Sequence, residues 1–170
     1  MFNLKFLVPN KKYKKFEKRL IKGKKIRDYD GHNERVGALS VFRDLLLSGS
    51  RDSKLLLRDL RSPQSPVLEF NGPRQEICGL KWSPDGEYFA SGSNDNSMMV
   101  FSPKTRFPIM KKSHRAAVKA IAWSPRQVGI LASGGGTADC RLRLWNVRKQ
   151  ALLDEVDTGS QVCSVMFSPH

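Results

Sequence analysis

Few residues in this sequence could do covalent or metal chemistry. Its three cysteines, Cys78, Cys140 and Cys163, are odd in number and far apart, with no Cys-x-x-Cys spacing that would indicate a zinc or redox site. We expect them to be buried thiols. No nucleophile stands beside a base in a known motif, no phosphate-binding loop is present, and potential metal ligands do not cluster. The sequence therefore predicts a protein that is not an enzyme and carries no metal or other cofactor.

The remaining polar residues recur with a fixed period, which indicates the elements that must hold them. Short runs of alternating apolar residues open at Val36, Ile77, Val118 and Val162, and these positions are 41, 41 and 44 residues apart. A period of about 40 to 45 residues is typical of β-propeller blades. A strand of small residues, such as Ser91–Ser93, follows each of the first three runs.

Within each unit the sequence predicts four short strands separated by turn residues. In the second unit we expect them at Ile77–Trp82, Tyr88–Ser93, Ser97–Phe101 and near Ile109–Lys111. In the third unit we expect them near Val118–Trp123, Ile130–Gly134, Arg141–Asn146 and Ala151–Asp157. The units span residues 31–71, 72–112 and 113–157, and a first strand of another unit falls within 158–170. The predicted fold class is all-β, an incomplete propeller of about three blades.

The start of the chain lies outside this period and is strongly basic. Residues 1–30 hold 11 Lys and Arg against three acidic residues, in a chain of net charge +14. We interpret residues 1–23 as a basic segment, either disordered or a short helix with Tyr13, Phe16 and Leu20 on one face. This segment could bind nucleic acid, or it could be a solvated flank without a partner. No apolar run is long enough to cross a membrane, so no membrane partner is expected.

Several residues of the three units resemble WD repeats. That resemblance implies a hydrogen-bonded relay from a His through a Ser to a turn Asp and a Trp, which satisfies polar groups inside a blade. The third unit has the full set, His114, Ser133, Asp139 and Trp145. The first unit keeps His32 and Asp52 but has Arg58 at the Trp position. The second keeps Asp95 but has Pro73 and Phe101 at the His and Trp positions. We expect structural roles for these His and Asp residues.

A longer set of blocks resembles the Fizzy and Fizzy-related activators of the anaphase-promoting complex, and the Fizzy-related branch fits best. The blocks occur in order at residues 31–39, 48–52, 75–82, 92–96, 117–123, 134–139 and 160–164. Order and spacing make this resemblance far more specific than any one motif. It implies a seven-bladed propeller that binds degron peptides, such as the KEN box and the destruction box, and brings substrates to a ubiquitin ligase.

The resemblance also implies which residues contact a KEN-box peptide. They are Asn94 and Asn96 after a second strand, Thr137 in a glycine-rich turn, and Gln161 before the fourth unit. Carboxamides offer donors and acceptors to a peptide's Asn and Glu side chains. The alternative is that Asn94 and Asn96 only build their turn. The family location would be the nucleus and the cytoplasm.

The same family has features that this sequence lacks. Seven blades need about 300 residues, whereas this chain holds three units, so we expect a fragment of a longer activator or a short chain that completes its ring with a partner. The C-box, the Ile-Arg tail and the blades of the destruction-box groove have no counterpart here. Residues Lys24–Tyr29 are expected to be an outer strand of a preceding blade. The alternative functions are a general WD-repeat scaffold, a basic nucleic-acid-binding protein or a nonfunctional fragment.

Overall fold

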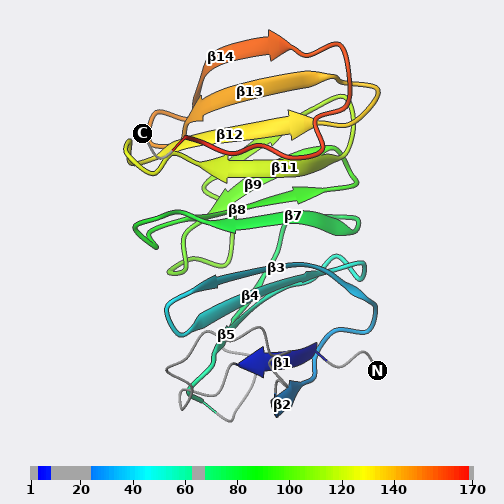
Figure 1. Ribbon diagram of the computed structural model, residues 1–170, viewed down its shortest axis with the longest axis vertical. Helices are drawn as coiled ribbons and strands as arrows, with labels where there is room; N and C mark the ends of the chain where they lie inside the picture. Colours follow the sequence, from blue (N-terminus) through cyan, green and yellow to red (C-terminus); the bar gives the residue numbers. More distant parts are fainter. Residues whose placement is uncertain (1–3, 9–23, 63–67, 169–170) are drawn as a thin grey trace, which may run out of the picture.

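The chain forms three four-stranded antiparallel sheets that lie side by side (Figure 1). The computed structural model describes residues 4–8, 24–62 and 68–168. The first sheet consists of β3 (Val36–Phe42), β4 (Leu45–Ser50), β5 (Leu55–Asp59) and β6 (Leu68–Phe70). The second consists of β7 (Ile77–Trp82), β8 (Phe89–Ser93), β9 (Ser97–Phe101) and β10 (Met110–Ser113). The third consists of β11 (Val118–Trp123), β12 (Ile130–Gly135), β13 (Arg141–Asn146) and β14 (Ala151–Asp157). The all-β expectation is confirmed.

The middle sheet is covered on both faces, and its sequence shows why. Every residue of β9 is buried, and successive side chains of a strand point to opposite faces. Met99 and Phe101 pack in the core shared with the first sheet, whereas Met98 and Val100 pack in the core shared with the third. A strand buried on both faces reads as a continuous apolar run rather than an alternation.

Aromatic side chains fill the core between the first and second sheets. The ring of Phe89 is stacked on that of Phe101 with their centroids 5.1 Å apart. The ring of Phe70 meets that of Phe89 edge-on at 4.9 Å. Edge-to-face and offset arrangements of this kind add to the burial of apolar area that already favours the contact.

One kind of contact, between a glycine and an aliphatic residue, recurs where each sheet meets the next repeat along the chain. A glycine in the second strand lies where the opening aliphatic residue of the following repeat approaches it. A Cβ added at Gly49 would lie 2.5 Å from Ile77 Cγ2, and one added at Gly134 would lie 2.3 Å from Val162 Cγ1. At Gly92 the added Cβ would lie 2.1 Å from the carbonyl oxygen of Val118. The glycine is therefore a socket for the next repeat.

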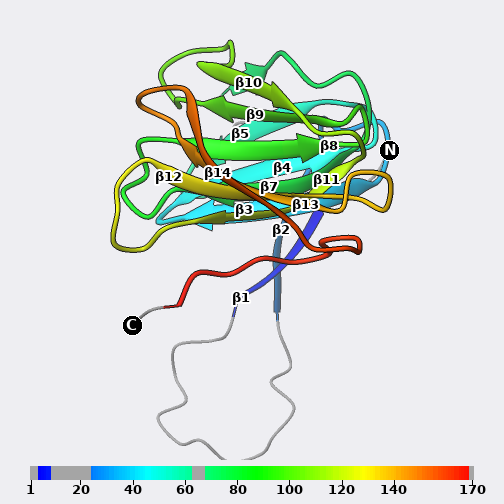
Figure 2. The ribbon, with the colours of Figure 1, turned by 90° about the horizontal axis from the view of Figure 1, so that it is seen from above.

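The segment Val162–Phe167 is not a strand, contrary to expectation. Its place beside the third sheet is set by the socket at Gly134 and by a hydrogen bond of 3.1 Å from the amide of Val162 to the carbonyl of Gly135. A strand needs a continuous ladder of backbone hydrogen bonds. Within the described ranges no strand pairs with this segment. Figure 2 shows the segment (red) running along the side of the sheets where β3, β7 and β11 lie.

The beginning of the chain also differs from expectation. Lys24–Tyr29 is a strand, β2, as expected, and it pairs antiparallel with a second strand, β1 (Leu4–Val8). Strand β1 lies within residues 1–23, which were interpreted as disordered or helical. Leu4–Val8 is apolar except for Lys5 and includes the β-forming residues Phe6 and Val8, so it suits an added strand. The possible helix around Tyr13, Phe16 and Leu20, and most of the basic segment for which nucleic-acid binding was one of two interpretations, lie outside the described residues.

Strand boundaries otherwise move by only one or two residues. β8 begins at Phe89 because Tyr88 belongs to the turn, where its amide donates to the Ser83 hydroxyl over 3.0 Å. The fourth strand of the second sheet runs from Met110 to Ser113. In the part of the chain that the structure describes, no helix is long and apolar enough to cross a membrane.

The socket at Gly92 gives a direct test of the packing. We expect Gly92→Ala to lower the free energy of unfolding by about 1–3 kcal/mol, because the new methyl group would meet the backbone carbonyl of Val118, which cannot move independently. Gly72→Ala is the control, since its methyl group would meet side-chain atoms, Sδ of Met99 at 2.7 Å and Cζ of Phe101 at 3.3 Å, rather than a backbone carbonyl. Denaturant unfolding measures both. Equal losses in the two variants would contradict a rigid socket.

Candidate functional site

The third sheet places the four expected relay residues in one hydrogen-bonded chain. Nδ1 of His114 lies 2.7 Å from Oδ2 of Asp139, and Nε2 of His114 lies 2.8 Å from Oγ of Ser133. The indole N–H of Trp145 donates to the same Oγ over 2.8 Å. All four residues are buried. Asp139 also accepts a hydrogen bond from the amide of Arg115, which fixes the turn after β12 to the loop before β11.

Burial lowers the pKa of His114 below its ordinary value, against the opposing effect of the Asp139 carboxylate. Burial alone would raise the pKa of the Asp139 carboxyl, but hydrogen bonds from His114 and from the Arg115 amide lower it. A neutral His114 donates from Nδ1 to the carboxylate and accepts the Ser133 hydroxyl proton at Nε2. The relay therefore satisfies its buried groups and leaves no free base for catalysis.

The first sheet keeps part of this chain. Nε2 of His32 lies 2.8 Å from Oγ of Ser48, whereas Nδ1 of His32 is 3.3 Å from the nearer oxygen of Asp52. Arg58, at the Trp position, turns away, donates to the carbonyl of Asp30 and lies over the ring of Tyr29. The guanidinium group of Arg58 thus contacts residues 29–30, which precede the first blade.

The second sheet lacks both partners of the relay serine. With Pro73 and Phe101 at the His and Trp positions, the hydroxyl of Ser91 is buried and has no hydrogen-bond partner among the described residues. Asp95 is satisfied differently, since it accepts hydrogen bonds from the amides of Arg74 and Ser97 at 2.8 and 3.0 Å. In this repeat Asp95 stabilises the turn through backbone amides, without a His or Trp partner.

Ser91 and Ser133 form a matched pair for mutation. Ser133→Ala should cost about 1–3 kcal/mol of unfolding free energy, because it leaves His114 Nε2 and the Trp145 indole buried without partners. Ser91→Ala should be neutral or stabilising by up to about 1 kcal/mol, because it removes a buried hydroxyl that has no partner among the described residues. Denaturant unfolding compares them. A similar loss in both variants would show that the relay adds nothing.

The relay also predicts how stability depends on pH. The folded-state pKa of His114 is lowered, so below its ordinary value of 6.5 the unfolded chain binds a proton that the folded chain does not. Stability should therefore fall as pH drops below about 6.5. His32 has a lowered pKa from burial too and acts in the same direction. Urea midpoints between pH 7.5 and 5.5 should shift less in His114→Asn than in the parent chain; an equal shift would contradict this origin.

The expected peptide-contact residues lie in loops at one end of the strands, which we call the rim. The rim consists of the loops before each first strand and after each second strand, residues 31–35, 51–54, 72–76, 94–96, 114–117 and 136–140, together with residues 158–161 before the segment that opens at Val162. Thr137 and Gln161 meet there, because the Thr137 hydroxyl donates to Oε1 of Gln161 over 3.1 Å. Both side chains are exposed. They come from the β12–β13 loop and from the segment after β14.

Asn94 and Asn96 have different environments in the turn after β8. Asn94 is exposed. Asn96 has a φ of 67°, which non-glycine residues rarely adopt. Its side-chain amide donates to the carbonyl of Arg115 at 3.4 Å, and its own carbonyl accepts from the amide of His114 at 2.9 Å. Asn96 thus ties the second repeat to the third.

Three arginines on the rim were not singled out by the sequence analysis. With Asn94 they surround a hollow of about 570 Å³, which is lined by Arg35, Arg51, Arg74, Gln75, Glu76 and Asn94. Arg35 makes a two-nitrogen contact with Oε1 of Glu76, at 3.0 and 2.7 Å. The signal available in the sequence was position, since Arg35 and Glu76 each directly precede the opening aliphatic of a repeat.

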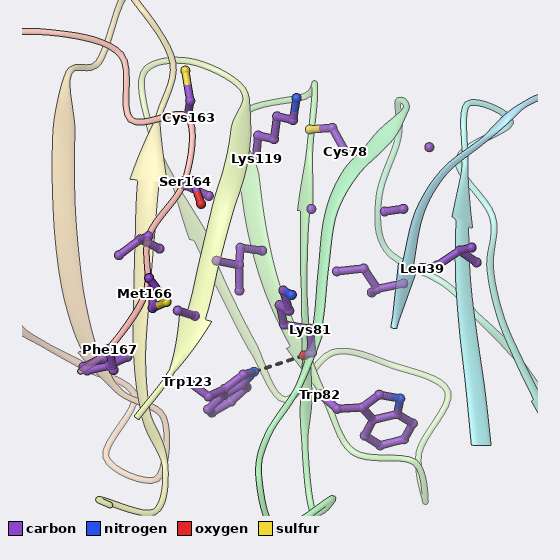
Figure 3. Close-up of a pocket in the computed structure, with 18 of the residues that line it drawn as sticks. Leu39, Cys78, Lys81, Trp82, Lys119, Trp123, Cys163, Ser164, Met166 and Phe167 are labelled. Atoms are coloured by element: carbon purple, nitrogen blue, oxygen red, sulfur yellow. Dashed lines mark hydrogen bonds between the residues drawn. The ribbon is translucent and has the colours of Figure 1, made fainter. Parts of the chain in front are cut away.

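A groove of about 780 Å³ runs along the inner strands β3, β7 and β11 and the segment 163–167. Figure 3 shows side chains of Cys78, Lys119 and Cys163 near one end of this groove and Trp82, Trp123 and Phe167 near the other. The Trp123 indole donates to the carbonyl of Lys81 over 3.0 Å, which joins β11 to β7. Cys140, the third cysteine, lies outside the groove lining. Among the residues that the structure describes, no group of potential ligands could hold a metal ion.

Comparison with known proteins accounts for this arrangement. The family described as WD domain, G-beta repeat matches residues 23–59, 64–102 and 107–146. The chain belongs to this family. A solved chain in the crystal structure of the mitotic checkpoint complex superimposes with a TM-score of 0.85 at 42% identity, over 86% of this chain and 45% of that one. The expected WD-repeat propeller fold, in part, is thereby confirmed.

Curated WD-repeat relatives place the chain more narrowly. It is 48% identical over 150 residues to Protein FIZZY-RELATED 1 of Arabidopsis thaliana, covering 88% of this chain and 32% of the relative. It is 45% identical over 150 residues to APC/C activator protein CDH1 of Saccharomyces cerevisiae, covering 88% of this chain and 26% of the relative. The expected similarity to Fizzy-related proteins is confirmed. The chain spans about a third or less of the length of these relatives.

Proposed function

We propose that this WD-repeat chain is part of a substrate-recognition adaptor of the anaphase-promoting complex and that its rim binds KEN-box peptides. The observation that carries the proposal is the Thr137–Gln161 hydrogen bond, which brings a hydroxyl and a carboxamide from two successive repeats together on an exposed surface. The relatives named as Fizzy-related and as an APC/C activator support the class of partner. The role is recognition, not catalysis, and the location is the nucleus and cytoplasm.

The chemistry of the rim suits a short polar peptide. With Oε1 of Gln161 accepting from Thr137, the amide nitrogen of Gln161 still offers two N–H donors and the Thr137 oxygen still offers lone pairs. Exposed Asn94 adds a second carboxamide beside Arg35, Arg51 and Arg74. A Glu side chain and an Asn side chain of a peptide could each find complementary groups here.

The geometry divides the four candidates into two roles. Asn94, Thr137 and Gln161 present exposed polar groups and would contact the peptide. The side-chain amide and the backbone carbonyl of Asn96 are both hydrogen-bonded to residues of the third repeat, so Asn96 would shape the turn that carries Asn94. Asn96→Gly, which suits a positive φ, should therefore retain most peptide affinity.

Peptide binding to the full chain tests the proposal. We expect Asn94→Ala, Thr137→Ala and Gln161→Ala each to weaken binding of a fluorescent KEN-box peptide about threefold to tenfold, the effect of losing one hydrogen bond. Thr105→Ala and Gln127→Ala, exposed at the opposite end of the strands, are matched controls. Fluorescence anisotropy gives the affinities. If all three rim variants stayed within twofold of the parent chain, the assignment would be wrong.

A further inference from the structure

The groove along the inner strands carries positive charge and no negative charge. Of the residues that line it, the charged ones are Lys81 on β7 and Lys119 on β11. Both lysines are exposed. Within the described ranges neither ammonium group has a carboxylate within ion-pair distance. Two cations that share a concave wall without a counter-ion attract an acidic ligand.

The groove opens directly onto the rim. The amide of Gly136, next to Thr137, donates to the carbonyl of Ala117, two residues before Lys119, over 3.0 Å. On the other side of the opening, Gln161 directly precedes Val162, and the groove lining begins again at Cys163. Figure 3 shows the Lys119 side chain extending toward the end of the groove where Cys163 lies. A peptide held by Thr137 and Gln161 can therefore continue past Lys119.

The strands that carry the two lysines are packed tightly against each other. Gly79 on β7 and Ala120 on β11 are both buried. Gly79 must stay small, because an added Cβ would lie 2.7 Å from the carbonyl oxygen of Lys119. The indole of Trp123 holds the backbone of Lys81 through its hydrogen bond to the Lys81 carbonyl. The charged heads thus project from a fixed backbone.

We infer that this groove binds an acidic stretch of the degron-bearing peptide and that Lys81 and Lys119 determine a preference for acidic residues beside the degron. The source of the peptide rests on the proposed function; the charge preference rests on the groove. The occupant is a peptide, because the groove adjoins carboxamide and hydroxyl groups on the rim and has the exposed apolar side chains of Leu39 and Met166 in its lining as well as the two lysines. The rim at Asn94 adds three arginines and one glutamate, so the entrance is basic too.

The test compares peptides that differ only in charge. Fluorescent KEN-box peptides extended on either side by four Glu or by four Gln are titrated against the full chain at low and high salt. The Glu form on one side should bind about threefold to tenfold more tightly than the matching Gln form, and the advantage should shrink at high salt. Lys81→Gln with Lys119→Gln should remove the advantage and leave the Gln form unchanged. Lys104→Gln with Lys149→Gln, at the opposite end of the strands, is the matched control.

Each outcome separates the two proposals. Loss of the advantage only in the Lys81/Lys119 variant supports the groove. No advantage for either Glu peptide, or an advantage that survives in that variant, overturns it.

If neither Gln form binds, the KEN-box proposal fails. The groove is then tested with Glu and Gln peptides in which KEN is replaced by three Ala: lysine-dependent binding of the Glu form supports it, and its absence overturns it. Binding of a single-stranded DNA oligonucleotide as tightly as the Glu peptide would also overturn a peptide occupant.

Discussion

The fit of an aliphatic side chain into a glycine socket sets the spacing of the repeats. Gly49, Gly92 and Gly134 each lie against the opening aliphatic residue of the following repeat, at distances that no Cβ would tolerate. This contact fixes how far apart neighbouring sheets lie, and therefore the size of the side chains between them. The stacked rings of Phe89 and Phe101 fill the space that results. Rim and groove inherit their geometry from the same contact, because the sockets lie next to the loops that carry Asn94 and Thr137.

The polar relay is secondary to this packing. The third sheet has the whole chain of hydrogen bonds from Asp139 to Trp145, the first has part of it, and the second has a buried Ser91 hydroxyl without its relay partners. All three sheets nevertheless have the same four-stranded order. Burial of apolar residues between sheets is enough to form a blade, and the relay adds local satisfaction of polar groups.

Much of the fold was predictable because the residues that pack between the sheets recur in the sequence with a nearly constant period. The period located the opening aliphatics, and the small residues of Ser91–Ser93 located the second strand of the middle sheet. The strand expected at Val162 failed because a strand depends on a partner, which a local pattern does not supply. The pairing of Lys24–Tyr29 with Leu4–Val8 was missed for a related reason, since a local pattern does not specify which strand pairs with which.

The candidate site was predictable in its residue types but not in its contacts. The hydrogen bond between Thr137 and Gln161 spans 24 residues, and the ion pair between Arg35 and Glu76 spans 41. Both depend on turn conformations that a sequence pattern does not specify. The shared groove of Lys81 and Lys119 was hidden by irregularities near the start of β7 and β11, since a bulge changes which residues face one side of a strand.

The seating of Val162 against Gly134 without a strand around it has a consequence for synthesis on the ribosome. A completed sheet can capture the first residues of the next repeat before that repeat has any hydrogen-bonded ladder of its own. Each finished blade would then act as a template for the one emerging after it, and assembly would proceed in the order of translation.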